Sequence, residues 1–290
     1  MDIKIIVATN KSYRMPTEKI YIPLHVGSAI AEDIDSGLAE YRRDDLGENI
    51  SSKNANYCEL TGLYWAWKNL RAEYVGIAHY RRHFAKRSLG TKWERIADEK
   101  CLCKRLRKYD VILPKKRNYY IETTYTQYIH AHNKQDLDET EKILKEYYPD
   151  YLEAYASAMK STKGHKFNML IMKKDILDKY CEWLFDVLFK LEARLDISGY
   201  SLKDQRVFGY VSERLLDVWL NTNKIPYAEL PVVHMEKQYW TRKILNFLIR
   251  KIRGTKLGAR TDEKRVGNRR DLQPVGITET MLGKVNSTKM

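Results

Sequence analysis

Short apolar runs alternate along this chain with longer stretches in which apolar residues recur every three or four positions. The runs are rich in β-branched and aromatic residues and have the length of buried strands. They lie at 3–8, 20–26, 74–78, 109–114, 167–172 and 227–233. Helical spacing occurs at 57–69, 93–107, 137–147, 151–159, 174–195 and 204–221. Strands that alternate with helices predict an α/β fold with a mostly parallel sheet flanked by helices.

The run at 74–78 leads directly into a positively charged segment. It is followed by His79, Tyr80, Arg81 and Arg82. In open α/β sheets, ligands bind at the carboxyl edge of the strands. Because the planar arginine fork suits phosphate oxygens, this edge is a candidate site for an anionic ligand. A solvated basic loop is the alternative interpretation.

Composition strengthens the case for an anionic partner. The 290 residues include 52 Lys and Arg against 38 Asp and Glu, a formal charge of +14. Such a charge favours nucleic acid, an acidic membrane surface or a phosphorylated substrate. About two-thirds of the excess lies between 237 and 270, after the apolar run at 244–249. This pattern is typical of a helix that lies on an anionic membrane.

The chain is therefore expected to have three parts. We expect a globular domain over 1–240, a basic amphipathic membrane-associating segment over 241–270, and a disordered tail over 271–290. Nucleic-acid binding is the competing interpretation of the charge. It predicts basic residues interleaved with aromatic ones across the folded surface, whereas here the excess is concentrated near the carboxyl terminus. No nucleic acid is expected as a partner.

Cysteine usage and hydropathy point to a cytosolic protein. The four cysteines show no zinc-site spacing, and the chain begins without a signal peptide, so we expect reduced thiols. No apolar run approaches the roughly 20 residues that a membrane-spanning helix needs.

Common nucleotide and metal motifs are missing. There is no GxxxxGK[ST] and no GxGxxG, which argues against a P-loop or Rossmann site. The pairs Asp33-Ile-Asp35 and Asp136-Leu-Asp138 could hold Mg²⁺ or Mn²⁺ at a diphosphate, but neither follows a strand, so we interpret them as surface acids. His130-Ala-His132 could ligate a metal only if it lay on a strand, and it lacks a third ligand. The metal requirement stays open.

Four segments together resemble one protein family. They are 56–69, 76–84, 164–173 and 206–219, and the resemblance extends over about residues 3 to 240. The family is that of bacterial capsular and exopolysaccharide glycosyltransferases known as domain of unknown function 4422, some of whose members are galactofuranosyltransferases. The resemblance implies a GT-A-like fold, a UDP-sugar donor and a lipid-linked oligosaccharide acceptor. It also implies a peripheral location on the inner face of a bacterial cell membrane.

The resemblance assigns roles near the run at 74–78. GT-A enzymes carry a metal-holding carboxylate motif after this strand, but here the position reads His79-Tyr-Arg-Arg82. Arg81 and Arg82 could therefore neutralise the departing diphosphate directly. Asn168 resembles an asparagine that contacts donor sugar or acceptor in related transferases. His234 and Lys237 resemble late residues that touch the diphosphate.

An inverting transfer needs a base for the acceptor hydroxyl. The candidates are Glu213 and Asp204, which flank the binding candidate Arg206, although Glu213 could equally pair with Arg206 or Arg214. The expected nucleotide-binding residues are Thr9, Asn10, Asp45 and Asn49. A scaffold of a polysaccharide assembly complex, without catalysis, is the remaining alternative.

Overall fold

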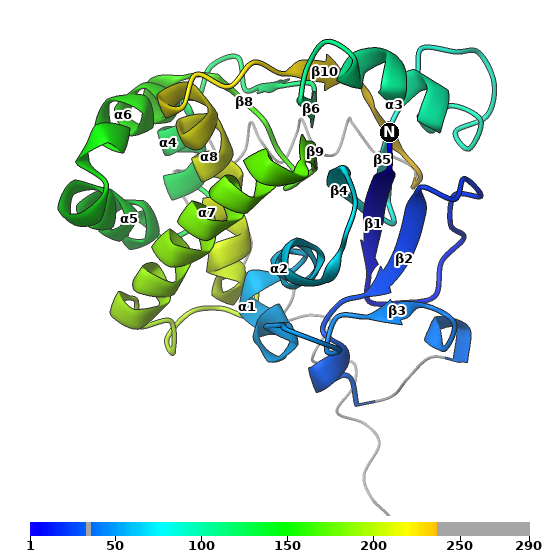
Figure 1. Cartoon of the computed structure of the whole chain (residues 1–290). Coiled ribbons are helices and arrows are strands. Elements are labelled where there is room, and N and C mark those ends of the chain that lie inside the picture. Colours follow the sequence, from blue (N-terminus) through cyan, green and yellow to red (C-terminus); the bar gives the residue numbers. More distant parts are fainter. Residues whose placement is uncertain (33–35, 237–290) are drawn as a thin grey trace, which may run out of the picture. The chain divides into compact units, whose positions relative to one another are not determined.

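In the computed structural model, which describes residues 1–32 and 36–236, the chain is organised around a nine-stranded sheet (Figure 1). Its strand order is β10-β6-β9-β4-β1-β2-β3, and the short strands β5 and β11 pair beside β4. The bounds are β1 Ile3–Thr9, β2 Tyr21–His25, β3 Arg42–Arg43, β4 Tyr74–His79, β5 Arg82–Phe84, β6 Val111–Pro114, β9 Leu170–Lys173, β10 Ala228–Leu230 and β11 Val232–His234. A separate pair joins β7 Arg117–Asn118 to β8 Lys163–Gly164.

The sheet is mostly parallel, as the sequence predicted, with one reversal in its centre. β1 runs parallel to β2 and β4, and β10 runs parallel to β6. By contrast, β9 is antiparallel to both of its neighbours, β4 and β6. The residues that precede β9 therefore lie at the edge where β1, β2 and β4 end.

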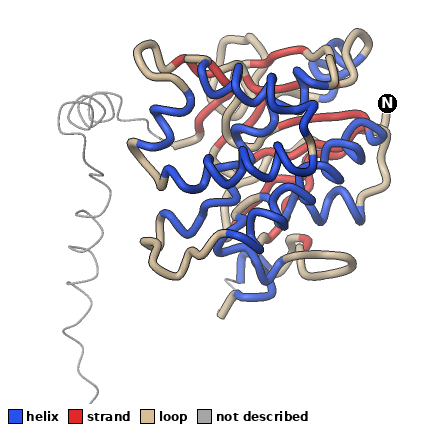
Figure 2. The backbone as a smooth tube through the Cα atoms, turned by 90° about the vertical axis from the view of Figure 1, so that its left-hand side faces the viewer, coloured by secondary structure: helices blue, strands red, loops and turns tan. Residues whose placement is uncertain are grey.

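Several helices lie over one face of the sheet (Figure 2), and α3 packs on the other. Alternate residues of β1 point to opposite faces. Ile6 and Ala8 belong to a core shared with α2, α5, α6, α7 and α8, whereas Ile5 and Val7 belong to a core shared with α3. The bounds are α1 Asn54–Tyr57, α2 Leu60–Asn69, α3 Glu99–Leu106, α4 Thr124–Ile129, α5 Lys134–Tyr147, α6 Leu152–Lys160, α7 Lys174–Arg194 and α8 Val207–Thr222.

Four predicted elements differ from the structure. The strand expected over 167–172 begins only at Leu170, because Phe167 and Asn168 have left-handed φ values. The helix expected over 57–69 breaks at Cys58, whose φ is +55°, so α1 and α2 are separate. The helix expected over 93–107 begins only at Glu99, because Ala97 donates a backbone hydrogen bond to the Phe84 carbonyl beside β5. The strand expected over 227–233 divides at Pro231 into β10, which pairs with β6, and β11, which pairs with β5.

Trp65 and Trp67 of α2 pack into the core, and the Trp67 ring stacks on Phe185. Asp136 was expected at the surface but is 1% exposed, because it accepts hydrogen bonds from the hydroxyls of Tyr128 and Tyr200.

The segments at the carboxyl terminus lie outside the residues that the structure describes. The boundary at 240, the membrane-associating segment over 241–270 and the tail over 271–290 therefore stay predictions. Among the helices of the described part, none is both long and apolar enough to cross a membrane.

Candidate active site

The carboxyl edge of the parallel strands forms the base of the candidate site. Ala8 of β1 pairs with His79 of β4, so the segments after both strands begin side by side. Because β9 runs in the opposite direction, Asn168 just before it belongs to the same edge. The edge at which the sequence predicts an anionic ligand therefore carries three segments, those after β1 and β4 and the one before β9.

The turn after β4 places two guanidinium groups and an imidazole together. His79 ends β4 and pairs with Arg82 at the start of β5, with Tyr80 and Arg81 between them. The backbone N–H of Arg81 donates to His79 Nδ1 at 3.3 Å. Burial, followed by the charges of Arg82 and Arg81, lowers the pKa of His79 to about 3. His79 is therefore neutral at physiological pH.

Arg82 is a half-buried cation without an ion pair among the described residues. Its guanidinium lies 4.6 Å from the centre of the Phe167 ring. Burial, followed by the charge of Arg81, lowers the pKa of Arg82. Arg81 by contrast lies 3.7 Å from the Glu236 carboxylate. The charges of Glu59, Glu213 and Glu236 act on Arg82 without forming an ion pair at contact distance. A desolvated guanidinium without such a contact favours binding of an anion.

Glu213 of α8 is held from two sides beside this turn. Its Oε1 accepts the Phe167 N–H at 2.8 Å, and its Oε2 accepts from Arg214 Nη1 at 3.0 Å. The pairing with Arg214 that the sequence left open is thus present. A carboxylate oxygen can accept more than one hydrogen bond, so Glu213 keeps capacity for a substrate hydroxyl.

The segment before β9 has an unusual backbone. Phe167 and Asn168 have φ values of +79° and +51°, a left-handed conformation that costs energy in residues other than glycine. The Asn168 amide donates to Glu59 Oε1 and to the Gly209 carbonyl, and its oxygen accepts from Ser212. These bonds anchor the segment between the start of α2 and α8, and the substrate contact expected of Asn168 stays a prediction.

Glu59 is a carboxylate at this site that the sequence interpretation missed. It was placed within one continuous helix, but the break at Cys58 brings its side chain to Asn168. Burial raises the pKa of Glu59. The only sequence signal would have been the Cys58-Glu59 pair at a helix break, and neither residue type marks such a break.

Lys166 is a second group that the sequence interpretation did not single out. It is buried, and its Nζ lies 5.4 Å from the centre of the Tyr119 ring. Burial, followed by the charge of Arg214, lowers the pKa of Lys166 to about 7. Together with Glu213 and Arg214 it lines a small cavity of about 90 Å³.

The two other candidates from the segment before α8 differ in position. Arg206 Nε donates a hydrogen bond at 3.0 Å to Sγ of Cys58, the residue that precedes Glu59. Asp204 instead lies 3.1 Å from His132 Nδ1 and accepts from the Ser201 hydroxyl. The structure therefore holds Asp204 in a polar network away from Phe167, whereas Glu213 contacts it directly.

Residues from the two ends of the described chain also reach the edge. The Thr9 hydroxyl donates to the Lys11 carbonyl in a tight turn, and Asn10 is exposed beside it. In β11, His234 pairs with Arg82, and its ring contacts Phe167 edge-on with centroids 5.8 Å apart. Lys237 lies outside the described residues, and its contact with a diphosphate stays a prediction.

The loop after β3 is built by its own hydrogen bonds. Asp45 pairs with Arg43, and the Asn49 amide donates to the Asp45 and Gly47 carbonyls. The hydrogen bond from Arg43 lowers the pKa of Asp45. Beside it, buried Asp44 accepts the Gly27 and Ser28 N–H groups and was not singled out from sequence. A nucleotide contact for Asp45 and Asn49 remains a prediction.

A metal site is not assembled in the described part of the chain. No group of three His, Cys, Asp or Glu side chains there could hold an ion. His130 and His132 follow α4 instead of lying on a strand, and they face Glu122 and Asp204. Asp138 pairs with Lys134, while Asp33 and Asp35 lie outside the described residues. The guanidinium groups of Arg81 and Arg82 have no lone pair for a cation.

The strand order defines a mostly parallel α/β fold of the GT-A-like class, and the turn after β4 makes its carboxyl edge cationic. The chain belongs to the family described as domain of unknown function (DUF4422), whose model matches residues 4–224. This confirms the family that the four segments indicated.

A solved structure titled "WbbM bifunctional glycosytransferase apo structure" is similar to this chain, with a TM-score of 0.73 and 30% sequence identity. The match covers 82% of this chain and 46% of the other, so this chain spans less than half the length of that protein. The match confirms the predicted fold class. A comparison with curated proteins found no significant match.

Proposed function

We propose that this protein is a glycosyltransferase that moves a hexosyl unit from a UDP-sugar to a lipid-linked oligosaccharide in bacterial surface-polysaccharide synthesis. Family membership and the similarity to a structure titled as a bifunctional glycosyltransferase support the class of reaction. Galactofuranosyl is the donor group we test first.

The observation that carries the proposal is Arg82. Its guanidinium is half-buried at the carboxyl edge, faces Phe167 and has no ion pair among the described residues. When the bond between the sugar and UDP breaks, negative charge develops on the departing diphosphate. A preorganised cation in a partly desolvated site stabilises that charge more than water does. Arg81, held near Glu236, would add a second donor once the substrate arrives.

Glu213 is the base in this proposal. Phe167 and Arg214 fix both carboxylate oxygens, so the side chain is oriented before the acceptor binds. The acceptor hydroxyl would donate its proton to Glu213 while its oxygen attacks the anomeric carbon and the bond to UDP breaks. Asp204 is disfavoured by its position, because it contacts His132 and Ser201, whereas Glu213 contacts Phe167, whose ring faces Arg82.

Mn²⁺ or Mg²⁺ is not required by this proposal. Arg81 and Arg82 occupy the position of the carboxylate motif, and we assign no step to a metal. Transfer assayed with and without EDTA tests this point directly. A more than tenfold loss with EDTA, restored by Mn²⁺, would show that a metal site exists.

The decisive experiment measures UDP release from a panel of UDP-sugars, including UDP-galactofuranose and UDP-galactose. Glu213→Gln should lower kcat by about 10² to 10⁴, the range for general base catalysis. Asp204→Asn is the matched control. Absence of turnover with every donor and several lipid-linked acceptors, together with unchanged UDP binding in Arg81→Ala, would favour the scaffold alternative.

Membrane attachment through 241–270 belongs to the same proposal. The segment would hold the enzyme on the inner face of the cell membrane, where a lipid-linked acceptor is found. Deletion of 241–290 should reduce sedimentation with anionic liposomes. Unchanged sedimentation would show that the segment is not the attachment.

A further inference from the structure

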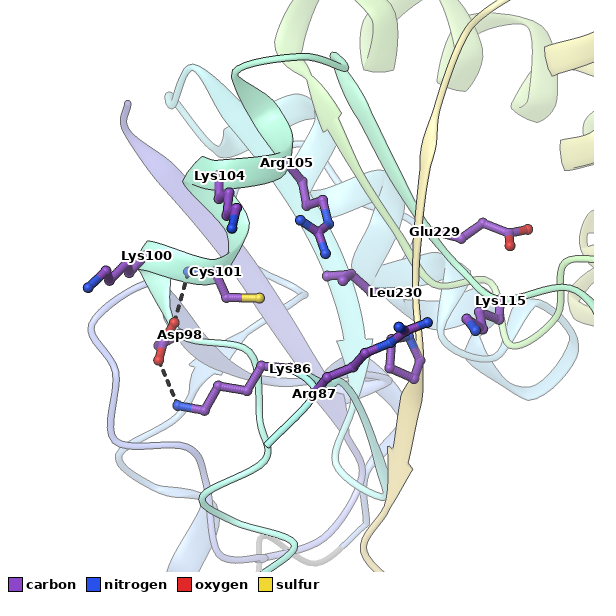
Figure 3. A pocket seen from close by; sticks show the side chains of 11 residues that line it. Lys86, Arg87, Asp98, Lys100, Cys101, Lys104, Arg105, Lys115, Glu229 and Leu230 are labelled. Carbon is purple, nitrogen blue, oxygen red and sulfur yellow. Dashed lines mark hydrogen bonds and ion pairs between the residues drawn. The ribbon is translucent and has the colours of Figure 1, made fainter. Parts of the chain in front are cut away.

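A basic groove lies on the far side of β5 and β11 from the candidate active site. It encloses about 440 Å³ between α3, the segment after β5 and the turn between β10 and β11 (Figure 3). Six cationic side chains and two acidic ones line it. They are Lys86, Arg87, Lys100, Lys104, Arg105 and Lys115, with Asp98 and Glu229.

Both acids of the groove are already engaged. Asp98 accepts from Lys86 Nζ at 2.6 Å and caps α3 by accepting the Cys101 N–H. Glu229 lies 3.2 Å from His165 Nε2. Among the described residues, the other five cations of the groove form no ion pair, so the groove carries a net positive charge that nothing there compensates.

The basic surface continues beyond this groove along the free edge of the sheet. A neighbouring groove of about 680 Å³ shares Lys104, Arg105 and Glu229 and adds Lys108. Both follow β10, the end strand of the sheet. Positive charge therefore extends over both grooves along α3 and β10. An anionic membrane surface attracts clustered cations of this kind.

An exposed apolar side chain follows Arg87 closely in the sequence. Leu89, two residues after Arg87, is 99% exposed in the loop between β5 and α3. A fully exposed leucine beside clustered cations has the chemistry of a membrane contact, because the cations bind headgroup phosphates while the leucine enters the acyl region. Nucleic acid is the alternative occupant: no aromatic residue that could stack on a base lines the first groove, whereas Tyr109 and Tyr227 line the second, and the DNA comparison below separates the two.

We propose that this basic groove and Leu89 dock the folded unit on a membrane surface rich in anionic phospholipids. The inference rests on described residues alone and depends neither on glycosyl transfer nor on the segment 241–270. The paired strands β5 and β11 run from the groove to the candidate site. At the groove, the Ala85 N–H donates a hydrogen bond to the Pro231 carbonyl, and at the candidate site Arg82 pairs with His234. Ala85 and Arg82 are three residues apart along the chain, which in a strand is about 10 Å.

Binding of the full-length protein to vesicles tests the proposal. Vesicles of phosphatidylcholine with 30% phosphatidylglycerol are compared with pure phosphatidylcholine by sedimentation. Each Lys or Arg neutralised near an anionic surface lowers partitioning about fivefold, so Arg87→Gln/Lys104→Gln/Arg105→Gln should lower it roughly 100-fold. Leu89→Ser should lower it about tenfold, the effect of losing most of one buried leucine.

The matched control neutralises three exposed lysines on the opposite side of the sheet, Lys145→Gln/Lys160→Gln/Lys179→Gln, with the same change in net charge. It should bind at least ten times more tightly than the groove variant, and both should keep the thermal stability of the parent. Equal losses in the two triple variants, or none in the groove variant, would overturn the proposal. So would tighter binding of a single-stranded DNA oligonucleotide than of the vesicles, weakened by the groove substitutions.

Discussion

Replacement of Arg82 by methionine tests the central electrostatic argument. Methionine keeps most of the arginine stem and its contact with Phe167 but removes the charge. Because Arg82 forms no contact ion pair among the described residues, and Glu59, Glu213 and Glu236 act on it only at longer range, its charge should contribute little to folding. The same charge should contribute strongly once a diphosphate is bound. The substitution therefore separates stability from binding.

The magnitudes follow from these contacts. Loss of the cation–π contact with Phe167 costs about 0.5–2 kcal/mol, and removal of a half-buried unpaired charge returns a similar amount. The free energy of unfolding of Arg82→Met should then stay within about 1 kcal/mol of the parent. A charged hydrogen bond to UDP contributes about 1.5–3 kcal/mol, so UDP should bind roughly 30-fold more weakly. In the transition state, loss of such a donor lowers kcat about 10² to 10³-fold.

Thermal denaturation with and without UDP measures both effects at once. At a UDP concentration 100 times the Kd of the parent, the ligand stabilises the parent by about 2.7 kcal/mol. The same concentration should stabilise Arg82→Met by only about 0.9 kcal/mol. Arg71→Met, at an exposed position after α2, is the control and should respond as the parent does. Full UDP stabilisation in Arg82→Met would refute the diphosphate site, and a loss of more than about 3 kcal/mol without ligand would show that Arg82 is structural.

Three further outcomes are expected. Gly76→Ala should destabilise the fold by about 1–3 kcal/mol in urea denaturation, because its Cβ would lie 2.7 Å from Ile171 Cγ1 and 2.8 Å from the Leu170 carbonyl oxygen; an unchanged midpoint would contradict this packing. Burial lowers the pKa of His83 in the folded state to about 4. As the pH drops from about 6.5 towards 4, the unfolded state takes up a proton that the folded state does not, so the free energy of unfolding falls. Between pH 7 and 5 the parent should lose about 2 kcal/mol more than His83→Phe, and parallel pH profiles would argue against a buried neutral imidazole. Asp204→Asn should keep UDP release within about threefold of the parent at saturating donor, since its carboxylate is engaged elsewhere, and a loss comparable to that of Glu213→Gln would make it the base.

Much of the site could be predicted because its main elements are local in sequence. The strand that ends at His79 and the two arginines after it are contiguous, so any parallel sheet containing that strand carries them to its carboxyl edge. The position of Glu213 was harder to predict. Its pairing with Arg214 was one of several options in the sequence. Only the structure shows that the Phe167 N–H, in a left-handed turn, donates a hydrogen bond to the Glu213 carboxylate.

The sequence by itself determined which segments form β1, β2, β4 and β6, since their apolar runs are long enough to be buried in any arrangement. It also determined the charge of the candidate site and, through four segments, the family. Only the tertiary structure decided the direction of β9, because an apolar run reads the same in parallel and antiparallel pairing. Only the tertiary structure brought Glu59 to Asn168 and buried Asp136 between two tyrosines. The contacts of Glu59 with Asn168 and of Asp136 with Tyr200 join residues far apart in sequence, and an acidic residue type by itself predicts exposure.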